Sequence, residues 1–326
     1  MNKMYKKIYH CSLIWYNEHK GLRKDILYMT VDLTKLVTES RNPRTMDIDT
    51  MSALEIVTIM NDEDNNVVKG VKEVLPEIAK AVEWCAESLR KNARIIYIGA
   101  GTSGRLGLMD SVECPPTYGV SPDVVVGLIA GGENAFIKAV EGAEDRKDLC
   151  IEDLKKINLC ADDIVIGLAA SGRTPYVIGG LEYANELGCK TVAVACNKNS
   201  KIGAIAKLAI EPVSGPEVVT GSTRLKSGTA QKMVCNMLST ASMILNGKVY
   251  QNLMVDVQQT NEKLVTRAEN IIMEATGCTR KEASKARVAA NGKVKLAVTM
   301  ILTGLDMDSA AKKLEDAKGH VRDAIK

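Results

Sequence analysis

Histidine is scarce in this sequence of 326 residues, which contains three. His10 and His19 lie within the first 28 residues, so the remainder of the chain holds only His320. One histidine cannot supply both a catalytic triad and the ligands of a metal ion. Acid–base chemistry in this protein must therefore depend on carboxylates.

Paired cysteines and long apolar segments are also missing. The nine cysteines are an odd number, spread from Cys11 to Cys278 without a C-x-x-C spacing, which disfavours a disulfide framework and a zinc site. No apolar run approaches the ~18 residues that a membrane-spanning helix needs. We therefore expect a cytoplasmic protein without a metal site or a membrane segment.

Outside the N-terminus, the sequence has no marked excess of positive or negative charge. Residues 1–28 hold six Lys/Arg against Glu18 and Asp25, and the rest of the chain carries 37 basic and 38 acidic residues. This balance does not indicate binding to nucleic acid or to an anionic membrane. We interpret residues 1–28 as a disordered extension, or as the product of a start codon upstream of Met29.

Hydrophobic periodicity predicts helices and strands in alternation. Residues 50–90 have helical spacing and predict two helices. The pattern then predicts strands at 94–99, 124–129, 163–168, 191–195 and 208–212, with helices from 103, near 133–142, near 174–187 and near 200–206, followed by helices at 229–245 and 261–275. This order predicts an α/β protein with a five-stranded, mostly parallel sheet that helices cover on both faces.

The C-terminus contains an internal repeat with a period of 27 residues. Thr276-Gly277, Ala283, Ala290 and Gly292 recur as Thr303-Gly304, Ala310, Ala317 and Gly319. Each unit predicts two short helices with a glycine break. We therefore predict a small helical subdomain at 268–326, which we interpret as a packing or dimerisation module.

Two predicted strands run into turns rich in glycine and hydroxyl groups. Backbone N–H groups and hydroxyls at the start of a helix attract anions, and the carboxyl ends of parallel strands meet at one edge of a sheet. These turns therefore predict a bound phosphorylated small molecule. The candidate binding residues are Gly101, Thr102, Ser103, Gly104 and Arg105 in the first turn, and Ser171, Gly172, Arg173 and Thr174 in the second.

Two alternatives concern these loops. Gly99 to Gly104 matches the dinucleotide motif G-x-G-x-x-G, but the second strand ends in Gly131-Gly132 where that motif needs an acidic residue. A phosphosugar is therefore favoured over a dinucleotide. A third hydroxyl cluster, which includes Ser222, precedes the helix predicted at 229–245 and either contacts the ligand or only caps that helix.

Glu113 and Glu144 are the candidates for acid–base chemistry. Glu113 stands just before Pro115, which is expected to break the helix, and Glu144 follows the helix predicted near 133–142, with Gly142 as its stop. In an unbroken helix Glu113 would lie ~15 Å from Ser103, too far to reach the same bound sugar. Either the helix is short, or a neighbouring subunit supplies Glu113 and a dimer forms the active site.

The chain from residue 32 onward resembles the etherases of the sugar isomerase (SIS) domain family that act on N-acetylmuramic acid 6-phosphate. The resemblance rests on nine segments, which are Leu36–Asn42, Met60–Asp64, Gly99–Gly107, Glu113–Thr117, Gly127–Glu133, Glu141–Asp145, Ala170–Tyr176, Glu217–Arg224 and Asn252–Asp256. Only residues 1 to about 28 fall outside it. The C-terminal repeat is less rich in leucine than is usual for the family, with Ala286 and Arg287 at positions where apolar bulk is expected.

The resemblance implies a three-layer SIS-type phosphosugar-binding catalytic domain at 29–267 and a UBA-like all-helical subdomain at 268–326. It further implies a cytoplasmic homodimer that needs no metal or cofactor and cleaves the lactyl ether of its substrate by elimination and hydration. Glu113 would then act as the acid on the departing lactate, and Glu144 as the second acid/base. Thr102, Ser103, Ser171, Thr174 and Ser222 would hold the phosphate or the sugar hydroxyls.

Two rival functions share this fold. One is a non-catalytic phosphosugar sensor similar to the glucokinase regulatory protein, a family understood to keep a counterpart of Glu144 and to lack one of Glu113. The other is an aldose–ketose isomerase, which needs a base but no acid for a lactyl group. Because this chain has both glutamates, the etherase is favoured.

Overall fold

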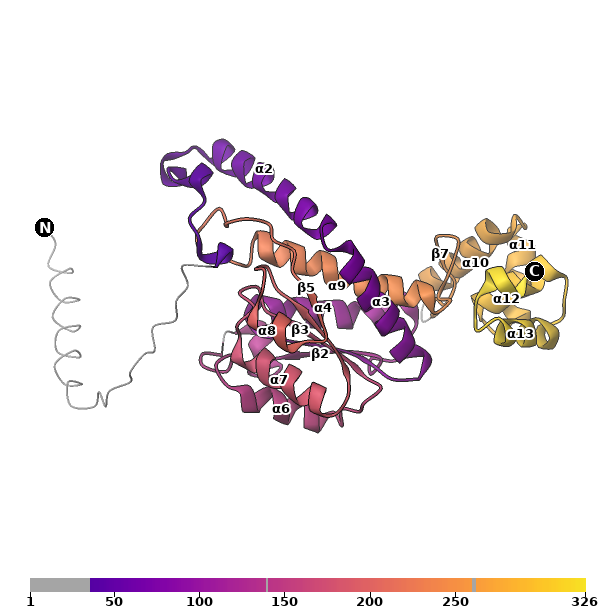
Figure 1. The fold of residues 1–326 in the computed structure, drawn as a ribbon. Coiled ribbons are helices and arrows are strands. Elements are labelled where there is room, and N and C mark those ends of the chain that lie inside the picture. The colour runs from indigo at the N-terminus through magenta and orange to yellow at the C-terminus, as the bar shows by residue number, and fades with distance from the viewer. Residues whose placement is uncertain (1–35, 139, 260–261) are drawn as a thin grey trace, which may run out of the picture. The chain divides into compact units, whose positions relative to one another are not determined.

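Five parallel strands form the centre of the molecule (Figure 1), a computed structural model in which residues 36–138, 140–259 and 262–326 are described. The strand order is β2-β1-β3-β4-β5, and every pairing between these strands is parallel. The strands are β1 (Ile95–Gly99), β2 (Val125–Ile129), β3 (Ile164–Leu168), β4 (Lys190–Val194) and β5 (Leu208–Ile210). The predicted α/β class and five-stranded sheet are thus confirmed.

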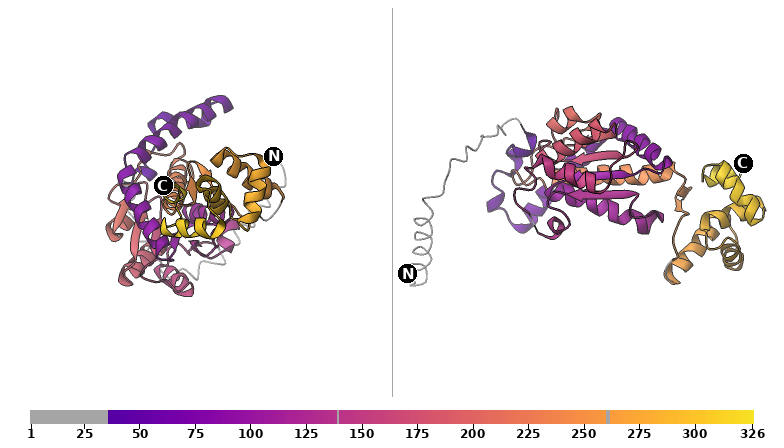
Figure 2. Two further views of the ribbon diagram at one scale, coloured as in Figure 1. Left: turned by 90° about the vertical axis from the view of Figure 1, so that its right-hand side faces the viewer. Right: turned by 90° about the horizontal axis from the view of Figure 1, so that it is seen from below.

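Helices cover both faces of this sheet, as Figures 1 and 2 show. Ile95 and Tyr97 of β1 pack against one group of helices, and Ile96 and Ile98 pack against the other, because successive side chains of a strand point in opposite directions. The first group comprises α2 (Ala53–Lys72), α3 (Leu75–Arg90), α4 (Gly101–Tyr118) and α9 (Lys226–Leu245), and the second comprises α6 (Lys147–Lys156), α7 (Pro175–Glu186) and α8 (Lys201–Ile205). The result is the predicted three-layer arrangement.

The remaining elements precede, connect or follow these layers. They are the 3-10 helices η1 (Val37–Glu39), η2 (Pro43–Thr45) and η3 (Ile48–Thr50), the short helix α5 (Asn134–Ile137), the antiparallel strands β6 (Val249–Tyr250) and β7 (Leu253–Met254), and the helices α10 (Glu262–Thr276), α11 (Arg280–Ala289), α12 (Val294–Thr303), α13 (Met307–Asp316) and α14 (Val321–Ala324). The extension predicted at 1–28 lies outside the described residues. The domain boundary predicted near 268 falls within α10.

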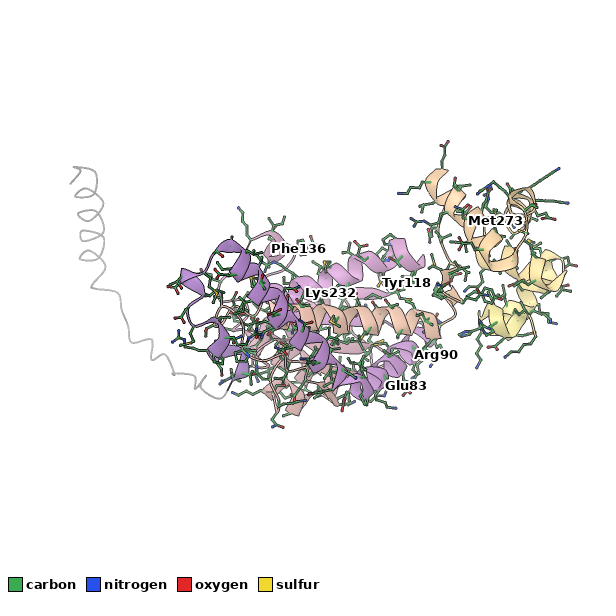
Figure 3. The ribbon with its side chains drawn as sticks, turned by 90° about the horizontal axis from the view of Figure 1, so that it is seen from above. Glu83, Arg90, Tyr118, Phe136, Lys232 and Met273 are labelled. Atoms are coloured by element: carbon green, nitrogen blue, oxygen red, sulfur yellow. The ribbon has the colours of Figure 1, made fainter. Side chains whose placement is uncertain are left out.

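The C-terminal repeat is visible in the backbone. Gly277 and Gly304 both adopt a left-handed conformation after a helix, with φ of 75° and 70°, and Gly292 and Gly319 do so again with φ of 79° and 80°. α11 and α12 therefore correspond to α13 and α14. These helices share an apolar core with α10, whose Met273 is labelled in Figure 3 and packs against that core. The predicted C-terminal helical region is confirmed, while its separation as a subdomain at 268–326 and its likeness to UBA domains stay predictions.

α4 does not break before Pro115, so that prediction is wrong. The helix continues through Pro115 and Pro116 to Tyr118, and it ends where Gly119 adopts φ of 63° and donates its N–H to the carbonyl of Pro115 at 3.0 Å. Prolines this close to the end of a helix interrupt only its last backbone hydrogen bonds. The Tyr118 hydroxyl, 3.0 Å from Oγ1 of Thr240 on α9, anchors the final turn.

The helix predicted near 133–142 is also wrong in length. α5 spans four residues and ends at Ile137, so Gly142 stops no helix, although it does adopt φ of 75° within a turn. Of the residues in α5, only Ala135 is buried, while Phe136 and Ile137 are exposed. A short helix without tertiary packing is not stable in water, because its first turn is costly to form. Sequence periodicity also did not predict α6.

A buried carboxylate connects α4 to β1 and α9. Oδ1 of Asp110 accepts hydrogen bonds from the amide of Asn236 at 2.7 Å and the hydroxyl of Ser239 at 3.2 Å, and Oδ2 accepts one from the Tyr97 hydroxyl at 3.0 Å. Burial raises the pKa of Asp110, and these hydrogen bonds oppose that rise without cancelling it. The carboxylate therefore holds its proton more tightly in the folded protein than in the unfolded chain.

We predict that Asp110→Asn changes how stability depends on pH. Because the pKa of Asp110 is higher in the folded state, the stability linked to this group is present at low pH and is lost as the pH rises through the folded-state pKa. Relative to wild type, the variant should gain stability as the pH rises from 4 to 8, as measured by urea unfolding. A constant difference between the two proteins at all pH values would contradict this account.

Candidate active site

Both predicted phosphate loops lie at the carboxyl edge of the sheet. The first follows β1 and the second follows β3, and these two strands are paired in register, with Gly99 opposite Leu168. From β1 the chain continues to β2 on one side of it, and the next strand, β3, lies on the other side. Ligands of open α/β sheets bind at such a switch point, in the crevice outside the carboxyl ends of the strands.

The first loop turns directly into α4. Gly104 lies so close to the end of β1 that a Cβ atom there would be 2.8 Å from the carbonyl oxygen of Gly99, so a larger residue would displace the helix. Thr102 is half-buried, and the Ser103 hydroxyl is buried and donates a hydrogen bond to Oε1 of Gln231 at 2.8 Å. Ser103 is therefore bound to α9, while Thr102 remains accessible to a ligand.

The second loop packs against the start of α8. Gly172 adopts φ of 72°, and a Cβ atom there would lie 2.4 Å from that of Ser200. The Gly172 carbonyl accepts the N–H of Ile202 at 3.0 Å. Thr174 precedes α7 but its side chain accepts no capping bond, and Ser171 is half-buried. The hydroxyls of this loop are thus positioned at the edge of the sheet and are not used to cap α7.

The third cluster meets the first loop. α9 begins at Lys226, three residues earlier than predicted, and a Cβ atom on Gly228 would lie 3.6 Å from Cγ2 of Thr102. The residue preceding α9 is Leu225, whose own side chain does not cap the helix. The capping interpretation of Ser222 is therefore not supported, and this residue lies in the loop that precedes α9, whose start lies beside Thr102.

The Arg105 side chain hydrogen-bonds to backbone carbonyl groups. Its guanidinium donates to the carbonyls of Ala135 at 2.7 Å and Phe136 at 2.9 Å. These bonds satisfy carbonyl groups of α5 and hold the segment after β2 against the start of α4. Figure 3 labels Phe136 and Tyr118 near the two ends of α4. Arg105 therefore positions a loop, whereas the prediction gave it a contact with the ligand. Arg173 is half-buried in the second loop.

The two candidate glutamates differ in their relation to these loops. The Glu144 carbonyl accepts the N–H of Tyr176, the second residue of α7, at 2.9 Å, so Glu144 lies beside the second loop. Glu113 is exposed on α4, ten residues beyond Ser103 in the same unbroken helix, which separates the two by about 15 Å along the axis. The alternative of a short helix is therefore excluded.

Several residues around the loops were not predicted as functional. Glu63 and Glu217 are buried carboxylates that bind the start of α9, and Asn197 binds the segment at Val37 and Thr38 to the end of β4. Glu63 and Glu217 belong to segments Met60–Asp64 and Glu217–Arg224, two of the nine that carry the family resemblance. Their position in these two segments is the sequence feature that points to a role near the site.

A separate cavity lies outside the candidate site. A cavity of about 830 Å³ lies among Lys248, Asp256, Lys295 and the C-terminal helices, and none of the predicted site residues lines it. Within the described ranges, no cluster of three or more His, Cys, Asp or Glu residues has the arrangement of a metal site. No described helix is both long and apolar enough to cross a membrane.

We predict that Gly172→Ala destabilises the protein more than Gly132→Ala. Both glycines have φ of 72°, so both variants lose about 1 kcal/mol to backbone strain. Only Gly172 also faces a clash, with Ser200, which should add about 1–3 kcal/mol, whereas no atom lies within 4 Å of a Cβ on Gly132. Urea unfolding of both variants measures the difference. Equal losses of stability would show that the second loop is not tightly packed.

Comparison with known proteins connects this geometry to a family. Residues 77–185 match a model described as the glucokinase regulatory protein N-terminal SIS domain, and residues 152–241 match the SIS domain model. The chain is 57% identical over 295 residues to the N-acetylmuramic acid 6-phosphate etherase of Enterobacter sp. (strain 638), which covers 90% of this chain and 99% of that protein.

Two further relatives show the same extent of similarity. The N-acetylmuramic acid 6-phosphate etherase of Clostridium botulinum (strain Langeland) is 57% identical over 296 residues, with 91% of this chain and 98% of that protein covered. The protein of the same name from Mycolicibacterium smegmatis is 55% identical over 295 residues, with 90% and 99% covered. The chain therefore belongs to the family of N-acetylmuramic acid 6-phosphate etherases, which are built on a SIS domain.

Proposed function

We propose that this protein cleaves the D-lactyl ether of N-acetylmuramic acid 6-phosphate to give N-acetylglucosamine 6-phosphate and D-lactate. The observation that carries the proposal is identity of 55–57% to etherases of this name over almost their whole length. The reaction adds one water molecule in total and changes no oxidation state overall, so it requires no redox cofactor. It serves the recycling of amino sugars from the cell wall.

The chemistry is an elimination followed by a hydration. With the sugar ring open, the aldehyde acidifies the proton on carbon 2, and a carboxylate removes it. Lactate then leaves carbon 3 as its oxygen receives a proton, and water adds to carbon 3 of the unsaturated aldehyde. These steps need one ionised and one protonated carboxyl group in the same site.

The residues divide these tasks. The loops at Gly101–Gly104 and Ser171–Thr174, together with Ser222, bind the phosphate and the sugar hydroxyls, while Glu144 beside the second loop is one acid/base. The second carboxyl group, the acid on the departing lactate oxygen, is Glu113. Because α4 is unbroken and carries Glu113 away from its own first loop, the Glu113 of a neighbouring subunit serves this site.

Exposed apolar surface supports a homodimer. On α4, Met109 and Val112 precede Glu113 by four residues and one residue, and they are 42% and 62% exposed. On the first turns of α2, Leu54 and Val57 are 75% and 57% exposed, and no residue from 53 to 62 is buried. Apolar helix surfaces of this kind are suited to an interface. A two-fold axis would then place each Glu113 at the partner's site.

The remaining predictions follow from the family. The eight described cysteines are all free thiols, which supports a reducing cytoplasm as the location. The match of residues 77–185 to the glucokinase regulatory protein model keeps a phosphosugar sensor as the second candidate function. The sensor binds its ligand without releasing lactate, and an isomerase converts a sugar phosphate without releasing lactate. Both are therefore distinguished from the etherase by the product.

We predict that wild-type protein releases D-lactate from N-acetylmuramic acid 6-phosphate and that Glu113→Gln and Glu144→Gln each lower kcat by about 10²–10⁴. Glutamine keeps the size of the side chain and cannot transfer a proton. Lactate is measured with a coupled dehydrogenase assay, and binding of N-acetylglucosamine 6-phosphate is measured by calorimetry as a control for folding. Binding without lactate from the wild type would make this protein a sensor.

We predict that mixing the two inactive variants restores activity. If Glu113 acts across a dimer interface, a mixed dimer has one site with both glutamates and one with neither. Random exchange of subunits should then recover about a quarter of wild-type activity, because half of the dimers carry one intact site out of two. The measurement is lactate release after the variants are mixed, partly unfolded and refolded together. No recovery would show that both glutamates act within one subunit.

A further inference from the structure

The third cluster is a closed loop whose two ends meet at one buried carboxylate. Glu217 is fully buried where the chain enters the loop at Val218–Leu225. Its Oε2 accepts the backbone N–H of Lys226, and its Oε1 accepts both the N–H and the hydroxyl of Ser227, all at 2.9 Å. Lys226 and Ser227 are the first residues of α9, so a side chain from the start of the loop caps the helix that ends it.

Lys226 reinforces this closure with an ion pair. Its side chain is 1% exposed, and its Nζ lies 2.5 Å from Oε2 of Glu63 on α2. Glu63 also accepts hydrogen bonds from Asn42 and from Arg44, both at 2.8 Å. Although burial favours a higher pKa for Glu63, the hydrogen bonds from Lys226 and Asn42 outweigh it and the pKa is lowered. Glu63 is therefore ionised at neutral pH.

The charged side chains of this cluster pair with one another. Lys226 pairs with Glu63, and Arg44 pairs with both Glu63 and Asp62. The N-terminal segment closes the loop from the other side, because the Thr45 hydroxyl donates to the Val218 carbonyl at 3.0 Å. A helix N-terminus often binds phosphate. Here the first N–H groups of α9 are already occupied by Glu217, so the loop's own groups and the first loop must contact the ligand.

We infer that Glu217 and Lys226 are positioning residues that hold the loop at Val218–Leu225 beside Thr102 in the geometry that binds the phosphosugar. The inference rests on the proposed function, and it concerns residues that need not contact the substrate themselves. Glu217 fixes the backbone where the loop ends, and Lys226 anchors the same point to α2 while it neutralises buried negative charge. Loss of either releases the loop, and the substrate then binds more weakly.

A matched carboxylate elsewhere provides the control. Asp163 is also buried and accepts two backbone N–H groups, from Arg94 at 2.9 Å and Cys160 at 3.0 Å, as well as a bond from the Arg94 guanidinium. It precedes β3 and therefore lies at the amino edge of the sheet, opposite the proposed site. Asp163→Asn should lower stability without affecting binding, because its contacts are of the same kind but remote from the loop.

The first test compares Glu217→Gln with Asp163→Asn and wild type. Glutamine keeps the shape of the side chain but turns one acceptor into a donor that faces a backbone N–H. We expect Glu217→Gln to raise KM for N-acetylmuramic acid 6-phosphate about tenfold, equivalent to ~1.4 kcal/mol of binding free energy, with kcat changed less than threefold. Asp163→Asn should lower the thermal midpoint and leave KM at the wild-type value.

The second test separates charge from packing. Lys226→Met leaves Glu63 without its buried partner, whereas the double variant Lys226→Met with Glu63→Gln removes the charge of both members of the ion pair. We expect the single variant to raise KM about tenfold and the double variant to recover most of that increase. The cycle isolates the pair because the two side chains are in direct contact.

Two outcomes would overturn the inference. If Glu217→Gln lowers the thermal midpoint as Asp163→Asn does but leaves KM unchanged, Glu217 has a structural role alone. If the Lys226→Met variant has the wild-type KM, the ion pair does not position the loop. We expect the Kd of N-acetylglucosamine 6-phosphate, measured by calorimetry without turnover, to change in each variant as KM does. A wild-type protein that binds this sugar but releases no lactate would contradict the proposed activity, and the same comparison of Kd values would still decide the role of the loop contacts.

Discussion

The close packing of α4 against the sheet is the constraint on which the rest of the site depends. Glycines at 104, 107 and 127 allow it, because a Cβ atom at any of them would lie within 2.6–2.8 Å of an atom in the facing element. Contact this close fixes the first phosphate loop at the end of β1 and leaves the helix no freedom to tilt. The direction of α4 then determines where Glu113 lies, so the packing of three glycines places this candidate catalytic group far from the first loop of its own subunit.

Buried polar groups fix the positions of the other helices relative to α4 and the sheet. Asp110 connects α4 to β1 and α9, and Ser103 connects the first loop to Gln231 of α9. At the start of α9, Glu217 and Lys226 close the third loop and attach it to α2. A polar group inside a protein is costly unless it is fully hydrogen-bonded, so each of these contacts defines one arrangement and penalises others. The site is therefore held by directional bonds between helices, whereas the apolar layers supply most of the stability.

Glu113 and Glu144 lie in different surroundings, and the proposed chemistry needs such a difference. Elimination needs a carboxylate that accepts a proton and a carboxylic acid that donates one, and two groups in the same surroundings would have similar pKa values. Glu144 belongs to a turn beside the second loop, whereas Glu113 stands on a helix surface with exposed apolar neighbours. In the proposed homodimer, association of two subunits would bury the surface around Glu113 and leave Glu144 in its own loop, so the two carboxyl groups would have different surroundings.

Local patterns in the sequence were sufficient for most of the elements and for the glycine turns after β1 and β3, because a strand buried on both faces and a glycine turn before a helix depend on neighbouring residues. The alternation of elements determined the parallel sheet, and the 27-residue repeat determined the paired C-terminal helices. The helix break predicted at Pro115 was wrong because the end of a helix depends on where the last turn finds hydrogen-bond partners, which here are Gly119 and Thr240. The tertiary structure alone decided the role of Arg105, the proximity of the start of α9 to Thr102, and the buried contacts of Glu63, Glu217 and Lys226. These contacts join residues far apart in the chain. Their energies depend on burial and on hydrogen-bond geometry, which a local sequence pattern does not reveal.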